Sequence, residues 1–150
     1  MVLFWVSLAA LCYIYVGYPL LVVALARVFG RDPSRRDITP SVSLLIPAYN
    51  EEAHLDAKLR NSLALDYPQE QLEIVVANDG STDRTGAIAQ GYAGRGVRVV
   101  AMPRNLGKAA MLGRVVPQLR SEIVVFSDAS SELERDALRR LIQNFADPSV

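Results

Sequence analysis

The chain has 150 residues, a length that suits one domain and is too short for two large ones. Its 16 lysines and arginines balance 16 aspartates and glutamates, so the net charge gives no support to nucleic acid as a partner. The single cysteine, Cys12, excludes an internal disulfide framework. The single histidine, His54, leaves a structural zinc site and a Ser-His-Asp site poorly supported.

The chain begins with an almost uniformly apolar segment from Met1 to Ala26, and Arg27 is its first charged residue. A charge-free run of this length exceeds the roughly 20 residues that a helix needs to cross a bilayer core. A cleaved signal peptide would have a basic start and a shorter apolar core. A buried helix of a soluble protein remains the alternative. We predict a transmembrane anchor over residues 1–29, kinked at Gly17 and Pro19, which a membrane helix tolerates.

Arginines dominate the C-terminal flank of this segment. The charged residues there are Arg27, Arg31, Arg35 and Arg36, against Asp32 and Asp37. Because no positively charged side chain precedes the segment, the excess of arginine predicts that this flank lies in the cytoplasm. Residues 30–40, which contain Pro33 and Pro40, predict a short linker. The expected location is therefore the cell membrane, with a single N-terminal helix and a cytoplasmic soluble domain.

The soluble part opens with a predicted buried strand over residues 42–46, which Pro47 is expected to end. In the loop that follows, Asn50 is the expected cap of a helix, with Glu51 and Glu52 in its first turn, where acids suit the helix dipole. The predicted buried stripe of this helix consists of the leucines that recur every fourth residue: Leu55, Leu59 and Leu63.

The segment of residues 72–85 predicts a second strand, a polar turn and the start of a helix. Residues 74–77 form an apolar, β-branched run that suits a strand buried on both faces. The run stops at a turn signal, after which Ser81 and Thr82 are expected to cap a helix over residues 83–93.

Asp79 lies in this turn, at the carboxyl end of the predicted strand. Open α/β sheets bind their ligands beyond the carboxyl ends of the strands, and a carboxylate there can accept hydrogen bonds from a ligand. Asp79 is therefore a candidate binding residue. The alternative stays open that Asn78 and Asp79 only shape the turn.

Two further strands are predicted, over residues 97–101 and 123–126. A loop over residues 103–108 leads into a helix that Pro117 should end or kink. After the fourth strand, residues 131–134 form a predicted capping box for an amphipathic helix. The apolar residues assigned to this helix are Leu133, Leu138, Leu141, Ile142 and Phe145.

Strand and helix thus alternate four times, which predicts an α/β fold with a parallel sheet and helices on both of its faces. The polar loops should open at one edge of the sheet, with Lys108 as a basic group among carboxylates. That combination suits a nucleotide held through its base, its ribose and a metal-bridged diphosphate. No Gly-x-Gly-x-x-Gly motif joins a strand to a helix, and the Walker pattern fails because Ala109 follows Lys108 and Met102 replaces the first glycine.

Four motifs in this part of the chain resemble those of family-2 glycosyltransferases. They are Ser43-Leu44-Leu45-Ile46-Pro47-Ala48-Tyr49-Asn50-Glu51-Glu52, Asn78-Asp79-Gly80-Ser81-Thr82-Asp83, Asn105-Leu106-Gly107-Lys108-Ala109-Ala110 and Phe126-Ser127-Asp128-Ala129. Their order and spacing match the nucleotide-sugar half of the inverting, Rossmann-like GT-A fold, over about residues 41–150. An N-terminal membrane helix also occurs in the membrane-bound polysaccharide synthases of this family.

The resemblance implies nucleotide-sugar contacts for seven residues: Ala48, Tyr49, Glu51, Asp79, Gly107, Lys108 and Asp128. The first three would line the nucleobase and ribose pocket, Asp79 would bind the uracil, and the Gly-Lys pair would border the nucleotide. Asp128 would open the Asp-x-Asp motif that holds a divalent metal, Mg²⁺ or Mn²⁺, on the diphosphate. Two residues depart from the family pattern. Ser130 replaces the second acid of that motif, and Asn78 stands where another aspartate is common.

The implied function is transfer of a sugar from a nucleotide-diphosphate sugar, with a UDP-sugar as the expected donor. The acceptor would be a saccharide or a lipid-linked molecule, in cell-envelope or exopolysaccharide synthesis. In the family the catalytic base and the acceptor site lie in the second half of the fold, so the catalytic residue is unknown and the fold is expected to be incomplete at the C-terminus. The alternatives are a catalytically inert, membrane-anchored nucleotide-binding fragment and a structural membrane adaptor.

Overall fold

A computed structural model describes residues 1–30 and 35–147 of the chain, which divides into two compact units, Met1–Ser34 and Arg35–Val150. The division falls inside the predicted linker of residues 30–40. Arg31, Asp32 and Pro33, which entered the predictions of the linker and the topology, lie outside the described residues. The assignment of residues 1–29, 30–40 and 41–150 as anchor, linker and donor-binding half stays a prediction.

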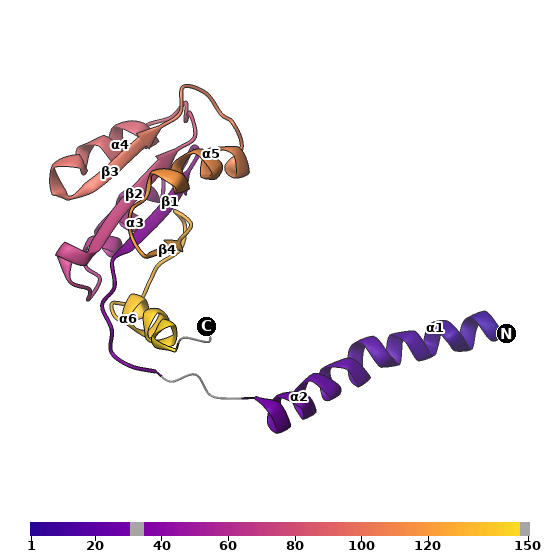
Figure 1. The fold of residues 1–150 in the computed structure, drawn as a ribbon. Coiled ribbons are helices and arrows are strands. Elements are labelled where there is room, and N and C mark those ends of the chain that lie inside the picture. Colours follow the sequence, from indigo (N-terminus) through magenta and orange to yellow (C-terminus); the bar gives the residue numbers. More distant parts are fainter. Residues whose placement is uncertain (31–34, 148–150) are drawn as a thin grey trace. The chain divides into compact units, whose positions relative to one another are not determined.

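The N-terminal unit is one run of helical residues (Figure 1). It consists of α1 (Val2–Cys12), a π-helical turn (Tyr13–Gly17) and α2 (Tyr18–Phe29). The 28 residues have a mean hydropathy of 2.1 in their most apolar window, none of which is buried, so length and composition make this helix a candidate membrane span. The π-helical turn lies where the sequence predicts a kink. Pro19 has no N–H to donate and crowds the preceding turn, which makes a wider turn favourable at this place.

The second unit is built on a four-stranded sheet, and all of its strand pairs are parallel. The strands are β1 (Val42–Ala48), β2 (Leu72–Asn78), β3 (Val97–Ala101) and β4 (Ile123–Phe126). Their order across the sheet is β3-β2-β1-β4, so β1 and β2 are central and buried (Figure 1). The predicted parallel α/β fold is therefore confirmed, and the bounds of β3 and β4 agree with the prediction.

Strand β1 continues through Pro47 to Ala48, which corrects the prediction that Pro47 ends it. The carbonyl of Leu45 accepts the N–H of Ser127 at 3.1 Å, so Leu45 and every second residue along β1 direct their backbone groups toward β4. Pro47 lies two residues after Leu45, so its nitrogen also faces the β4 side of the strand. At this level β4 has already ended, at Phe126. Because no donor is needed there, the sheet tolerates the proline.

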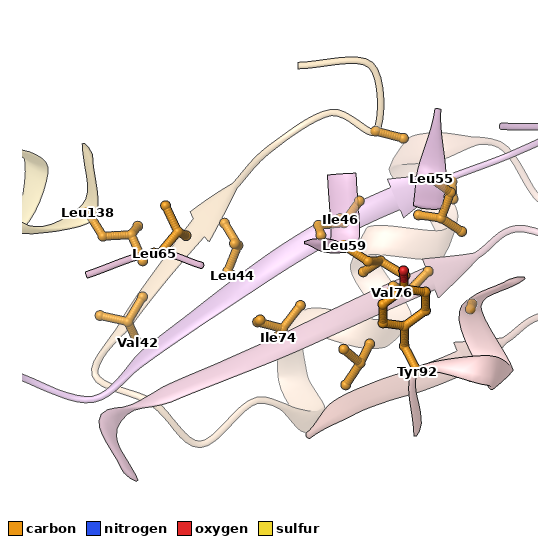
Figure 2. Packing of buried hydrophobic residues seen from close by; sticks show 14 of the residues in the cluster. Val42, Leu44, Ile46, Leu55, Leu59, Leu65, Ile74, Val76, Tyr92 and Leu138 are labelled. Carbon is orange, nitrogen blue, oxygen red and sulfur yellow. The ribbon is translucent and has the colours of Figure 1, made fainter. Parts of the chain in front are cut away.

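Helices cover both faces of the sheet, as predicted. They are α3 (Leu55–Leu63), α4 (Thr85–Gly91), α5 (Lys108–Val115) and α6 (Ala137–Ile142), with 3-10 turns at Gln69–Gln71, Ala93–Arg95, Val116–Gln118 and Gln143–Ala146. Successive strand residues point to opposite faces, which divides the apolar side chains into two clusters. On one face Leu44, Ile46 and Val76 pack with α3, α4 and α6 (Figure 2), and on the other Leu45 and Val75 pack with α5.

Helix α3 begins at Leu55, so the prediction that Asn50 caps it was wrong. Residues 51–54 form a turn first, in which the carbonyl of Glu51 accepts the N–H groups of His54 and Leu55. Asn50 has a φ of 54° and uses its side chain on another loop. Of the predicted stripe, Leu55 and Leu59 are fully buried, whereas Leu63, at the end of the helix, is 36% exposed.

The caps predicted for the two later helices were also wrong. Helix α4 begins at Thr85, whose N–H donates to the carboxylate of Asp83 at 2.9 Å, while Ser81 and Thr82 contact Asn50 instead. Helix α6 begins only at Ala137, so residues 131–134 form no capping box. Leu133 precedes the helix, Leu138 and Ile142 are buried in the core, and Leu141 and Phe145 are exposed. In both cases a hydroxyl predicted as a cap has a partner elsewhere in the fold.

Candidate functional site

A pocket of about 350 Å³ opens at the carboxyl ends of the strands, a volume typical of sites that hold small molecules. Residues after β1, β2, β3 and β4 all contribute to it, as expected for parallel strands that end at one edge. Seven of its lining residues are those singled out from the sequence: Ala48, Tyr49, Glu51, Asp79, Gly107, Lys108 and Asp128. The structure thus brings the candidate residues together, and their roles toward a ligand stay predictions.

Asp79 forms part of the pocket wall and ties two loops together. Its residue is 3% exposed, and its two carboxylate oxygens accept the N–H groups of Leu106 and Gly107, each at 2.9 Å. Asp79 therefore does more than shape its own turn, because it fixes the loop that leads into α5. A carboxylate oxygen has a second acceptor position, so this role is compatible with a ligand contact.

Gly80 allows these two loops to approach each other, and Gly107 shapes the turn that leads into α5. Both have positive φ angles, 67° and 85°, which glycine adopts without strain. A Cβ atom on Gly80 would lie 2.3 Å from the backbone carbon of Arg104. Asn78, which departs from the family pattern, accepts the N–H of Ser81 at 3.0 Å and shapes the turn.

The loop after β1 is held against the loop after β2 by several hydrogen bonds. The side-chain oxygen of Asn50 accepts the N–H of Thr82 at 2.9 Å, and the N–H of Glu51 donates to the hydroxyl of Thr85 at 2.7 Å. Thr85 itself is fully buried. These bonds fix the backbone around Glu51, whose side chain lines the pocket. Tyr49 also lines the pocket and is 46% exposed.

Lys108 and Asp128 form an ion pair at the pocket, with Nζ 2.8 Å from Oδ1. Lys108 is the first residue of α5, and Asp128 follows β4 by two positions. The hydrogen bond and the positive charge of Lys108 lower the pKa of Asp128 below its ordinary value. Both side chains are more than half exposed, so the pair itself is weak and can be exchanged for other partners.

A metal ion could be held here only with help from a ligand. Within residues 1–30 and 35–147, no group of three or more His, Cys, Asp or Glu side chains could hold a metal ion. Asp128 has one carboxylate oxygen that takes no hydrogen bond from the described residues, and Ser130 lines the same pocket. Mg²⁺ is often bound by one or two carboxylates together with substrate phosphates. The residues present therefore fit a divalent cation that arrives with a diphosphate.

Asn105 and Met111 also line the pocket, and sequence reasoning did not single them out as site residues. The side chain of Asn105 accepts the N–H of Gly107 at 3.0 Å, a local turn that an asparagine two residues before a glycine could have signalled. Met111 is three residues after Lys108 on α5, so one helical turn places it on the same side.

Comparisons with known proteins agree with this geometry. The profile of the family described as glycosyl transferase family 2 matches residues 43–150. A beta-monoglucosyldiacylglycerol synthase of Synechocystis is 33% identical over 114 residues, which are 73% of this chain and 24% of that protein. A poly-beta-1,6-N-acetyl-D-glucosamine synthase of Staphylococcus epidermidis is 32% identical over 105 residues, 69% of this chain and 25% of that protein. The chain thus spans about a quarter of the length of these curated relatives.

Two solved structures show the same similarity. A mannosyltransferase from Pyrobaculum calidifontis, in complex with GDP-Man and Mn²⁺, matches with a TM-score of 0.80 and 30% identity. The match covers 95% of this chain and 44% of that one. TarS 1-349 of S. aureus, in complex with UDP-GlcNAc, matches with a TM-score of 0.61 and 27% identity, over 67% of this chain and 30% of that one.

Proposed function

The chain belongs to glycosyl transferase family 2, and on this premise we propose that its pocket binds the nucleotide-diphosphate sugar of a transferase reaction. The observation that carries the proposal is the meeting of the loops after all four strands around one cavity of about 350 Å³. At this cavity the cation of Lys108 and the carboxylate of Asp128 stand together. A bound diphosphate is stabilised by positive charge beside it. Lys108 supplies one such charge, and a carboxylate can bind a divalent metal ion that supplies another.

The residues divide into two groups along the pocket. Ala48, Tyr49 and Glu51 would enclose the base and ribose, where the exposed tyrosine ring offers a stacking surface and the carboxylate accepts hydrogen bonds from hydroxyl groups. Asp79 would accept a hydrogen bond from the N–H of uracil and, through its bonds to residues 106 and 107, support the loop beside the phosphates. Gly107 would border the nucleotide with its backbone.

A divalent cation, Mg²⁺ or Mn²⁺, would be held by Asp128 together with the diphosphate. The mannosyltransferase that resembles this chain is in complex with GDP-Man and Mn²⁺, which supports the proposal. When bound, such a cation neutralises the negative charge that develops on the departing diphosphate. Lys108 would contribute a second positive charge once the diphosphate replaces Asp128 as its partner.

We further propose that the acceptor is a saccharide or a lipid-linked molecule and that the reaction serves cell-envelope or exopolysaccharide synthesis. The names of the two enzyme relatives, a glycolipid synthase and a polysaccharide synthase, support this class. The helix of residues 2–29 would anchor the chain in the cell membrane. The arginine excess after it supports a cytoplasmic position of the catalytic domain, where the donor would bind.

The direct test is calorimetric titration of the detergent-solubilised protein with UDP and with GDP, each with and without Mn²⁺. We expect binding of UDP that Mn²⁺ strengthens, and weaker binding of GDP. Binding of GDP in preference to UDP would contradict the UDP-sugar assignment, and no binding of either would contradict the proposed site. Incubation with radiolabelled UDP-sugars then separates a transferase from an inert nucleotide-binding fragment, because only the former consumes the donor.

A further inference from the structure

Lys58 is among the largest side chains that the fold buries completely. It lies on α3 between Leu55 and Leu59, and its residue is 1% exposed. A lysine in such a place is unfavourable unless its ammonium group is paired or fully hydrogen-bonded, because burial removes the water that stabilises the charge. The site described above gives Lys58 no role, so its contacts need an explanation of their own.

The contacts of the Lys58 ammonium all lead to one turn, residues 127–131, which follows β4. Nζ lies 2.6 Å from the hydroxyl of Ser127, 2.8 Å from the carbonyl oxygen of Ser131 and 3.3 Å from the hydroxyl of Ser131. These three contacts match the three N–H donors of an ammonium group. Lys58 therefore holds both ends of the turn, and the residues between those ends, 128–130, line the pocket.

The charges around Lys58 belong to the same segment. Burial lowers the pKa of Lys58, while the negative charges of Asp128 and Glu132 act in the opposite direction. In the part of the chain that the structure describes, no carboxylate forms an ion pair with Lys58, so its direct partners are neutral oxygens. Two lysines lower the pKa of Asp128, Lys108 through direct contact in the pocket and Lys58 through its positive charge.

We propose that Lys58 is a positioning residue of the donor site, which holds the turn of residues 127–131 so that Asp128 presents its carboxylate to a diphosphate-bound metal. The inference rests on the proposed function, since it assigns Lys58 to the same site. A buried apolar side chain would stabilise α3 equally well without fixing the turn. The ammonium group adds a constraint at both ends of the turn, and rigid support of this kind governs how well a ligand to a metal is aligned.

The test compares Lys58→Met with Asn61→Ala. Methionine is unbranched like lysine and one heavy atom shorter, and it leaves no unpaired charge in the core. Asn61, on the same helix, binds both backbone groups of Leu133, at 2.8 Å and 3.0 Å, and so anchors the same segment just beyond the turn. Asn61→Ala is therefore a matched control for general loosening of this segment. Circular dichroism establishes that both variants fold.

Two affinities are measured for each variant: that of UDP in the presence of a chelator, by calorimetry, and that of Mn²⁺ for the UDP complex, by electron paramagnetic resonance. For Lys58→Met we expect the Mn²⁺ affinity to fall about tenfold, the loss of roughly one charge-assisted hydrogen bond, with the UDP affinity unchanged within about twofold. For Asn61→Ala we expect both affinities to stay within about twofold. An unchanged Mn²⁺ affinity in Lys58→Met, or an equal loss in Asn61→Ala, would overturn the inference.

Should Lys58→Met fail to fold, Ser127→Ala decides, because it removes the shortest contact of the ammonium and leaves the buried lysine in place. A fall in Mn²⁺ affinity at constant UDP affinity supports the positioning role, and an unchanged Mn²⁺ affinity refutes it. Failure of the inference is distinct from failure of the proposed function. If only the inference fails, the unaltered protein and the variants all bind UDP and Mn²⁺. If the proposed function fails, the unaltered protein does not bind UDP.

Discussion

The ammonium of Lys108 lies 2.8 Å from Oδ1 of Asp128, so the cation and the carboxylate assigned to a nucleotide diphosphate are paired with each other. Lys108 is the first residue of α5, Asp128 follows β4, and both side chains line the pocket. Because the pair is exposed, little free energy is needed to separate it. When a diphosphate enters with a metal ion, Asp128 can therefore release Lys108 and bind the metal, while Lys108 binds the phosphates.

The first prediction concerns Asp128. We expect Mn²⁺ binding to be negligible without nucleotide and measurable with UDP, because one carboxylate is too few ligands without the phosphates. Asp128→Asn should abolish the UDP-dependent binding, whereas Ser130→Ala should change it little, since a hydroxyl is a weak neutral ligand. Titration followed by electron paramagnetic resonance measures both variants.

Asp136→Asn is a suitable control for Asp128→Asn, because Asp136 pairs with Arg140 and does not line the pocket. Two results would show that the metal ligand is a different residue. One is tight Mn²⁺ binding in the absence of nucleotide, and the other is UDP-dependent binding that survives Asp128→Asn.

The second prediction concerns Asp79. Asp79→Ala should weaken UDP binding by at least about 1–3 kcal/mol, because the variant removes the acceptor for the base, leaves the N–H group of Leu106 without its partner and takes one of two acceptors from Gly107. Asp79→Asn keeps one acceptor oxygen and should cost less. Calorimetry measures the affinity, and thermal denaturation measures the accompanying loss of stability. An unchanged UDP affinity in Asp79→Ala would leave Asp79 a purely structural role.

The third prediction concerns Lys108, whose charge should act on the phosphates alone. Lys108→Met should weaken UDP about threefold to tenfold, the range for an exposed charged contact, and should leave the affinity for uridine unchanged. Raised salt should reduce the difference between the variant and the unaltered protein, because salt screens exposed charges. Equal losses for UDP and uridine would mean that the substitution disturbs the whole pocket.

The fourth prediction concerns the topology of the N-terminal helix. A cysteine introduced by Arg36→Cys, with Cys12→Ser to remove the native thiol, should react with a membrane-impermeant reagent only after the cells are opened. The reason is the excess of arginine on this side of the apolar segment. Labelling of intact cells at this position would place the domain on the external side.

The strands were predictable because parallel, doubly buried strands are continuous apolar runs, and the bounds of β3 and β4 agree with the structure. Pro47 misled the prediction because its tolerance depends on where β4 ends, which is a property of the sheet register rather than of local sequence. The meeting of the candidate residues in one pocket followed from the parallel topology alone. Their predicted role as nucleotide-sugar contacts came from the family resemblance.

The errors at helix starts have a common physical cause. Asn50, Ser81 and Ser131 are all good caps by residue type, yet each makes tertiary contacts that local propensity does not contain. The burial of Lys58 was not predicted, for a similar reason. A lysine in a helix normally faces solvent, and nothing near it in the sequence shows that two serines some seventy positions later satisfy its ammonium group.

Asp79 accepts hydrogen bonds from two residues of the loop that leads into α5, and at Gly80 the backbone lies close to the same loop. This arrangement determines how the pocket wall can open. The amide hydrogen of Leu106 exchanges with solvent once its bond to Asp79 breaks and the loop leading into α5 separates from the loop after β2, whereas Asn105 of the same loop also accepts the N–H of Gly107. The exchange of the Leu106 amide with deuterium therefore reports the opening of this wall of the pocket. A nucleotide that rests on both loops should slow the exchange of the Leu106 amide, so this backbone position can serve as an intrinsic, label-free gauge of occupancy.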